Sequence, residues 1–234
     1  PYRPVNYDGK FHGPVTVRTA LSNSFNMPAV KTLDFVGIYD DPNTPQKDGM
    51  IGMAERLGIT SFTRPDYGLS LTLGGGDVSL LELTSAYSVF ANGGKKIPPV
   101  AILRIVDFKG KVVYEYQLPE TDQVIRAEHA YLISSILSDN EARRPEFSPN
   151  NLLVIPGHRV AAKTGTSGTD RFDVRDGWTI GYSPQIAAGV WVGNTDPAPV
   201  AEGMSGYRMA SPIWNTFMTR YLANREPQSF ARPE

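Results

Sequence analysis

The sequence predicts an α+β fold in which an antiparallel sheet of about five strands is flanked by helices. Three observations lead to this prediction. The first half of the 234-residue chain contains several helical segments, its middle contains one hairpin pattern, and its second half contains three successive apolar segments followed by a helix. Successive strands joined by short polar connections pair most simply as antiparallel neighbours.

Four helices are predicted in the first half, and residues typical of helix ends bound each of them. Ser79 and Glu82 form a capping box, Pro28 suits a first helical turn, and glycines follow the last turns. The four helices are predicted at residues 16–23, 28–36, 50–57 and 80–92.

The second half alternates between strand and helix patterns. Residues 107–111 are a polar turn between two apolar segments, which predicts a β-hairpin, and residues 140–158 are a polar connection. Ser211 and Pro212 indicate the start of the last helix. Strands are predicted at 100–106, 112–117, 160–168, 177–182 and 186–193, and helices at 127–137 and 213–222.

The composition excludes several classes of function. A net charge of −1 gives no basic footprint for nucleic acid, and no stretch approaches the ~20 apolar residues that span a bilayer. Cysteine is absent, and the three histidines share no metal-ligand spacing. We therefore expect no metal and no cofactor. Arg143 and Arg144 are interpreted as part of a solvated loop rather than as a phosphate clamp.

The sequence Lys163-Thr164-Gly165-Thr166 falls in the first of the three late strands. Gly165 lacks a side chain, so a substrate backbone can lie close along an edge strand. The threonine hydroxyls can donate to a carboxylate, and Lys163 adds a positive charge that favours an anion. An exposed strand edge also offers backbone N–H groups for a peptide or an oxyanion.

A second short motif, Ser24-x-Asn26, lies between the first two predicted helices. Either motif alone is weak, because short polar sequences are common. Class A β-lactamases and penicillin-binding proteins combine Ser-x-x-Lys, a Ser-x-Asn type of motif and Lys-Thr-Gly. The order of the two motifs here is the order in those proteins.

The chain resembles class A penicillin-binding proteins over nearly its whole length. One small departure is Ala161-Ala162, where the family usually has Ala-Gly. The matching stretches are residues 13–21, 24–30, 73–87, 90–94, 162–167, 176–178, 181–182 and 192–193.

The resemblance implies a role for each motif residue. Ser24 resembles the serine that passes a proton between a catalytic lysine and the amine. Asn26 resembles the residue that binds the substrate amide carbonyl and holds that lysine. Lys163 is similar to the lysine that supplies the positive field, and Thr164 and Thr166 resemble the hydroxyls that hold the terminal carboxylate of D-Ala-D-Ala or of a β-lactam. The Thr166 N–H resembles an oxyanion donor.

The Ser-x-x-Lys motif of the family is absent, because no serine of the chain has a lysine three residues later. The resemblance therefore implies a domain truncated at its N-terminal side, with the nucleophile upstream of Pro1. The parent would be a D,D-transpeptidase that acts on peptidoglycan stem peptides, binds β-lactams and lies outside the cytoplasmic membrane, anchored by its missing part. The chain alone is expected to be inactive.

Two alternatives remain at this stage. One is hydrolysis in place of transfer, as in a carboxypeptidase or β-lactamase, and the other is a binding or structural module without catalysis. In either case residues 1–223 are expected to form the partial domain, and residues 224–234 a polar, frayed tail.

Overall fold

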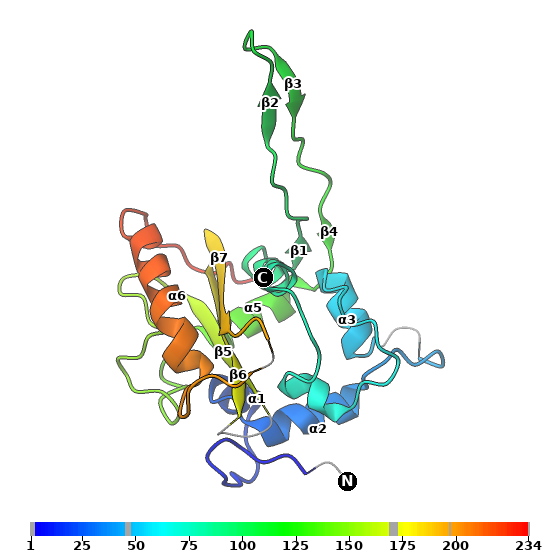
Figure 1. Cartoon of the computed structure of the whole chain (residues 1–234), viewed down its shortest axis with the longest axis vertical. Coiled ribbons are helices and arrows are strands. Elements are labelled where there is room, and N and C mark those ends of the chain that lie inside the picture. The colour runs from blue at the N-terminus through cyan, green and yellow to red at the C-terminus, as the bar shows by residue number, and fades with distance from the viewer. Residues whose placement is uncertain (1–2, 45–47, 169–172, 197, 234) are drawn as a thin grey trace.

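The computed structural model describes residues 3–44, 48–168, 173–196 and 198–233. Its centre is a three-stranded antiparallel sheet, with helices on both faces, and a narrow ribbon projects from the body (Figure 1). The sheet consists of β5 (Ala161–Gly168), β6 (Val174–Ser183) and β7 (Ile186–Gly193), in that order across the sheet. In the described part of the chain β5 pairs with β6 alone, so its other edge is open.

One face of the sheet is covered by α6 (Gly206–Leu222) and the other by α4 (Leu80–Ala91) and α5 (Ala127–Leu137). The helix α6 can approach closely because β6 has a glycine beneath it. A Cβ at Gly181 would lie only 2.3 Å from the indole ring of Trp214. Burial of Trp214 therefore depends on this glycine.

The remaining helices form a second cluster beside the sheet. They are α1 (Val17–Ser22), α2 (Asn26–Val36), α3 (Met50–Leu57) and the 3₁₀ helix η1 (Leu69–Leu73). Buried side chains from α2, α3 and η1 share one small core, so these elements hold one another in place. Its buried members are Leu33, Ile51, Tyr67 and Leu71.

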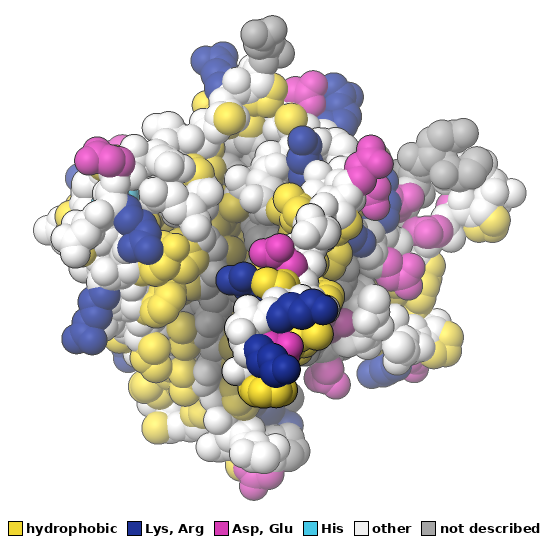
Figure 2. Space-filling view, turned by 90° about the horizontal axis from the view of Figure 1, so that it is seen from above, with side chains coloured by type: hydrophobic (Ala, Val, Ile, Leu, Met, Phe, Trp, Pro, Cys, Tyr) yellow, Lys and Arg dark blue, Asp and Glu magenta, His cyan; other side chains and the backbone are white. Residues whose placement is uncertain are grey.

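The ribbon is built from two short antiparallel pairs. At its base β1 (Lys95–Lys96) pairs with β4 (Asp122–Gln123), and at its end β2 (Arg104–Val106) pairs with β3 (Val112–Glu115). Every residue of β2 and β3 is exposed. Seen from the ribbon's end, hydrophobic side chains lie next to lysine and arginine side chains on the part of the molecule nearest the viewer (Figure 2).

The predicted α+β class with an antiparallel sheet is confirmed, but the strands are distributed differently. The predicted count of five included the hairpin at 100–106 and 112–117, which in the structure is a separate ribbon. In the part of the chain that the structure describes, no helix covers either face of β2 and β3, and their residues are all exposed. Within the described residues the sheet itself has three strands.

Two details at the C-terminal end were predicted wrongly. The helix α6 starts at Gly206, with Ser205 as its N-cap, so Pro212 lies inside the helix rather than at its start. The tail was expected to fray, yet the ring of Phe230 packs 5.5 Å from the ring of Tyr182. This aromatic contact ties the tail to β6.

Candidate functional site

Ser24 occupies the turn between α1 and α2, at the residue that closes α1. The Ser24 N–H donates to the Leu21 carbonyl at 3.3 Å, and the Phe25 N–H donates to the Ala20 carbonyl at 3.0 Å. This pair of hydrogen bonds is a Schellman motif, whose left-handed residue is usually glycine. Ser24 takes that conformation with φ of 59°, the sole non-glycine residue to do so in the described segments. A left-handed serine costs about 1 kcal/mol or more, and such strain concentrates at functional sites.

Lys163 extends from β5 towards this turn. Its Nζ donates to the Ser24 Oγ at 2.6 Å and to the Thr164 carbonyl at 2.7 Å. The structure therefore brings together two motif residues that are 139 positions apart in the sequence. Ser24 itself is exposed, so its hydroxyl also faces solvent.

Asn26 is the first residue of α2 and lies on the other side of Ser24. Its Nδ2 donates to the Val5 carbonyl at 2.8 Å, and the neighbouring Met27 N–H donates to Asn6 Oδ1 at 3.0 Å. The N-terminal loop thus caps α2 and engages the Asn26 amide. The catalytic lysine that the resemblance gives as a partner of Asn26 belongs to the Ser-x-x-Lys motif, which this sequence does not contain, so that hydrogen bond stays a prediction.

Thr164 and Thr166 share the face of β5 that looks towards α6. The Thr166 hydroxyl oxygen accepts from the Gly206 N–H, at the start of α6, at 2.9 Å. Gly206 fits tightly here, because a Cβ on it would lie 2.0 Å from the Gly165 carbonyl oxygen. The hydroxyl proton of Thr166 remains available for a ligand, since that bond uses the oxygen as an acceptor.

Gly165 lies opposite Trp178 on the other face of β5. A Cβ at Gly165 would meet the Trp178 Cβ at 3.4 Å, which is ordinary van der Waals contact. Internal packing therefore does not demand a glycine at this position. Its presence is instead consistent with close approach of a molecule from outside.

The pKa of Lys163 is lowered to about 8. Burial of the amine is the largest cause, the Arg143 guanidinium also lowers the pKa, and the Glu146 carboxylate raises it. The side chain of Lys163 is half-buried. Near neutral pH its charged form predominates, while its neutral form becomes accessible with a modest rise in pH. A lysine poised in this way can both hold an anion and exchange a proton.

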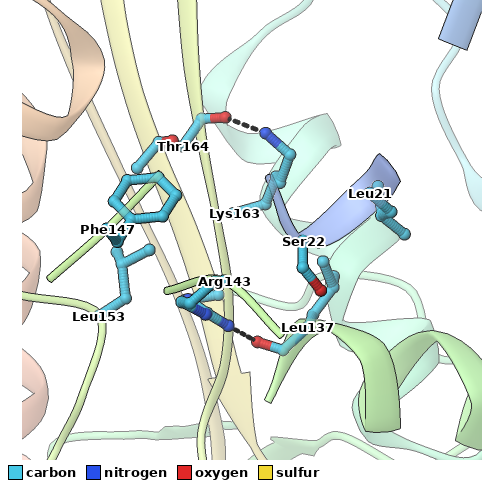
Figure 3. Close-up of a pocket in the computed structure, with 9 residues that line it drawn as sticks. Leu21, Ser22, Leu137, Arg143, Phe147, Leu153, Lys163 and Thr164 are labelled. Carbon is cyan, nitrogen blue, oxygen red and sulfur yellow. Dashed lines mark hydrogen bonds between the residues drawn. The ribbon is translucent and has the colours of Figure 1, made fainter. Parts of the chain in front are cut away.

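Arg143 lies in a narrow crevice between α1, α5 and β5, on the inner side of Lys163 (Figure 3). Its Nη2 donates to the Leu137 carbonyl. Arg143 is 2% exposed, so the prediction that it belongs to a solvated loop is wrong. The adjacent Arg144 is exposed and pairs with Glu141 at 2.7 Å, as predicted for such a loop. Two adjacent arginines carry no sequence signal that tells which one turns inwards.

The fold and the paired motifs define the class of the protein. A lysine on an edge strand next to α6 meets a serine at a turn between helices, which is the arrangement expected for penicillin-recognising domains. The sequence matches the family model "Penicillin binding protein transpeptidase domain" over residues 1–219. The chain therefore belongs to the penicillin-binding protein transpeptidase family.

Relatives of known name agree with this assignment. The chain is 36% identical to penicillin-binding protein 1A of Aquifex aeolicus over 230 residues, which is 95% of this chain and 28% of that protein. It is 31% identical to penicillin-binding protein 2D of Bacillus subtilis, over 100% of this chain and 32% of that protein. The class A resemblance is confirmed, and the chain spans less than a third of the length of these relatives.

Solved structures show the same fold. The PonA1 protein of Mycobacterium tuberculosis, solved in complex with penicillin V, superposes with a TM-score of 0.80 at 22% identity, covering 98% of this chain and 62% of that one. Penicillin-binding protein 1A of Haemophilus influenzae gives a TM-score of 0.80 at 23% identity, covering 98% of this chain and 38% of that one. At these identities the likeness concerns the fold.

The described residues contain neither a metal-ligand cluster nor a membrane-spanning helix. No group of three or more His, Cys, Asp or Glu side chains there could hold a metal ion. None of the helices in those residues is both long enough and apolar enough to cross a membrane.

Proposed function

We propose that this chain is the larger part of a transpeptidase domain that cross-links peptidoglycan by serine acyl transfer, and that it is a target of β-lactams. The single observation that carries the proposal is the 2.6 Å contact between Lys163 Nζ and Ser24 Oγ beside the open edge of β5. This contact unites the two motifs next to a strand edge on which a peptide can lie.

The chemistry proceeds in two balanced steps. In the first step a serine oxygen attacks the carbonyl of the penultimate D-Ala, an ester forms, the amide C–N bond breaks, and D-Ala leaves with a proton on its amine. In the second step the amine of a neighbouring stem peptide attacks the ester carbonyl, a new amide C–N bond forms, the ester C–O bond to the serine breaks, and the proton lost by the amine returns to the serine oxygen. A β-lactam reacts in the first step alone, through opening of its ring amide.

Ser24 suits the transfer of a proton to the leaving amine. Because Lys163 donates to the Ser24 oxygen, the Ser24 hydroxyl proton is free to point towards the substrate. The left-handed conformation of Ser24 holds the hydroxyl at a fixed place in the turn. Asn26, two positions after Ser24, is assigned to the amide carbonyl of the substrate. To bind it, the Asn26 Nδ2 must exchange its hydrogen bond to the Val5 carbonyl for one to the substrate.

The carboxylate of the substrate is assigned to β5. Thr164 and Thr166 present hydroxyls on one face of the strand, and Lys163 lies on the other. The amino-terminal end of α6 lies next to Thr166, and the partial positive charge of a helix start favours an anion there. Gly165 leaves the strand accessible, and the Thr166 N–H is assigned to the oxyanion.

The nucleophile and its lysine base are assigned to a segment that precedes residue 1, together with an anchor in the bacterial cytoplasmic membrane. The support is that no serine of the chain has a lysine three residues later, although both other motifs are present. The domain would then act on the outer face of that membrane. Residues 1–223 form the part contributed by this chain, and residues 224–234 are its C-terminal extension.

A second candidate is a binding module without catalysis, and the missing Ser-x-x-Lys motif is the observation that favours it. The intact mass of the natural protein separates the two. A mass that includes an upstream segment with Ser-x-x-Lys supports the transpeptidase, and a natural start at Pro1 supports the binding module.

Lys163→Ala in the whole natural protein tests the transpeptidase directly. We expect acylation by a fluorescent penicillin to slow about 30- to 1000-fold, since a preorganised charge next to the reacting group contributes about 2–4 kcal/mol. Lys109→Ala, at the tip of the ribbon, is the matched control and keeps the wild-type rate. A Lys163→Ala rate within a few-fold of wild type would contradict the assignment.

A further inference from the structure

The turn between α5 and β5 is attached to the turn that carries Ser24. Asn23, which is 2% exposed, makes the connection. Its Nδ2 donates to the Thr19 carbonyl at 2.9 Å and to the Ala142 carbonyl at 2.8 Å, and its Oδ1 accepts from the Glu146 N–H at 3.1 Å. Residues 142–146 therefore keep a fixed position relative to Ser24 and to Lys163.

This attached turn buries a cation, the Arg143 guanidinium. The Nη2 of Arg143 donates to the Leu137 carbonyl, while its Nε has no hydrogen-bond partner. No carboxylate in the described part of the chain lies within ion-pair distance of this guanidinium, although Asp139 acts on it from further away. A buried and unpaired guanidinium is costly. The fold retains it in a crevice that Lys163 also lines, with the guanidinium pointing towards Leu137 and the Lys163 amine towards Thr164 (Figure 3).

The same turn also carries a negative charge that acts on Lys163. Glu146 is exposed, and its carboxylate stabilises the Lys163 ammonium, while Asp8 of the N-terminal loop repels Glu146. The charged groups that act on Lys163 are thus Arg143 and Glu146, both from one turn. Asp139 and Asp8 act in turn on these two residues.

We propose that residues 139–146 control the protonation state of Lys163, with Arg143 disfavouring its ammonium form and Glu146 favouring it, so that both are positioning residues of the site. This inference rests on the proposed function, in which Lys163 supplies a positive charge near the substrate carboxylate and donates to the Ser24 hydroxyl oxygen. An unperturbed lysine stays charged up to about pH 10.4 and could not exchange a proton near neutral pH. Burial of the amine and the Arg143 guanidinium together bring that exchange within reach, and Glu146 acts in the opposite direction, towards the charged form that binds an anion.

Amine reactivity measures the protonation of Lys163 without any need for catalysis. The natural full-length protein is pulse-labelled with a trace of acetic anhydride over a range of pH, and peptide mass spectrometry follows the acetylation of Lys163. In the wild type we expect a midpoint of about 8. Arg143→Met keeps the length of the side chain, removes the charge, and should move the midpoint upwards by about one pH unit.

If Arg143 and Glu146 act through their charges, removing each charge should shift the labelling midpoint of Lys163 in opposite directions. A merely structural role of the turn would not give opposite shifts. Glu146→Gln should lower the midpoint by about half a pH unit, because a stabilising charge is lost at an exposed residue. Arg143→Lys retains a cation and should restore the wild-type midpoint. Arg144→Met is the matched control, since Arg144 is adjacent, exposed and already paired with Glu141. It should leave the midpoint in place.

The pH profile of penicillin acylation should follow the same order of variants, with its alkaline limb displaced upwards in Arg143→Met and downwards in Glu146→Gln. Equal midpoints in Arg143→Met, Arg144→Met and the wild type would overturn the inference. If Arg143→Met does not fold, Glu146→Gln decides: a lowered midpoint supports control by this turn, and an unchanged one overturns it. Absence of acylation in the wild type would instead refute the proposed function, while the labelling midpoints would still decide on the turn.

Discussion

The β5–β6–β7 sheet and the β2–β3 ribbon are both antiparallel and were predicted from similar apolar patterns, yet they differ in what they contact. In the sheet, Ile180 and Tyr182 of β6 are 2% and 0% exposed. In the ribbon every residue of both strands is exposed, including Ile105 and Val113. The difference lies in the helices that cover the sheet.

Glycines permit this covering. A Cβ at Gly177 would lie 2.4 Å from Met209 of α6, and a Cβ at Gly189 would lie 2.2 Å from Thr84 of α4. The ribbon has its one glycine, Gly110, in the turn, with nothing nearby. An apolar strand pattern therefore predicts burial only where the strand also contains small residues on which a helix can pack.

The comparison also explains where the site lies. Ser24 and Lys163 come from a turn and a strand that packed helices hold on both sides. Catalytic contacts need positions fixed to a fraction of an ångström, which an uncovered ribbon cannot supply. None of the assigned site residues lies on the ribbon.

Trp214→Ala should give the largest contrast between the two regions. The indole is fully buried against β6, and its Nε1 donates to the Ala188 carbonyl at 3.1 Å. We expect the free energy of unfolding to fall by about 3–5 kcal/mol, as for other large aromatic truncations. Denaturant titration followed by circular dichroism measures this change.

The matched substitution on the ribbon is Phe108→Ala. Phe108 is 93% exposed, so it should change the unfolding free energy by under about 0.5 kcal/mol. If both variants lost similar stability, the ribbon would be part of the cooperative core and the contrast would be wrong.

Lys163→Met should stabilise the protein near neutral pH, although it damages the site. The folded-state pKa of Lys163 is lowered to about 8, below the value of about 10.4 for an unfolded chain. The unfolded state therefore binds more protons between these two pH values. Wild-type stability should rise with pH across this window, and the penalty is fully present below about pH 8.

The expected gain for Lys163→Met is about 1 kcal/mol at pH 7, after allowance for partial exposure and for the lost bonds to Ser24 and Thr164. The gain should vanish towards pH 10.5, as shown by thermal unfolding at several pH values. Lys109→Met on the ribbon serves as control and should show no such pH dependence. A loss of stability at pH 7 in Lys163→Met would mean that the charged form of Lys163 does not destabilise the folded state.

Elements whose ends are set locally could be predicted from the sequence. The structure has α3 at Met50–Leu57 and α5 at Ala127–Leu137, as predicted, and Thr16 and Ser79 cap α1 and α4. The start of α6 was predicted wrongly although a local signal exists, because Ser205 Oγ accepts from the Arg208 N–H and caps the helix, whereas the prediction relied on Pro212. The separation of the ribbon from the sheet, by contrast, depends on contacts that are absent from any local pattern.

The candidate site was predictable in part for the same reason. The motifs assigned Ser24 and Lys163 to one site, and the structure adds that the two side chains are in contact. The burial of Arg143 rather than Arg144, and the anchoring role of Asn23, arise from the turn between α5 and β5. Both depend on which way a polar segment turns against α1, and composition does not encode that direction.

Val113→Thr should have the smallest effect of these substitutions. It tests whether the β2–β3 ribbon opens independently of the central sheet. Val113 is 63% exposed on β3, and threonine keeps the branched shape that suits a strand. We expect the global unfolding free energy to change by under about 0.5 kcal/mol. Native-state hydrogen exchange provides the more sensitive readout, because ribbon amides should exchange through local opening while β6 amides should exchange close to the global limit. If the amides of β3 were protected as strongly as those of β6, the ribbon would be held by a contact outside the described residues, and its independence from the core would be refuted.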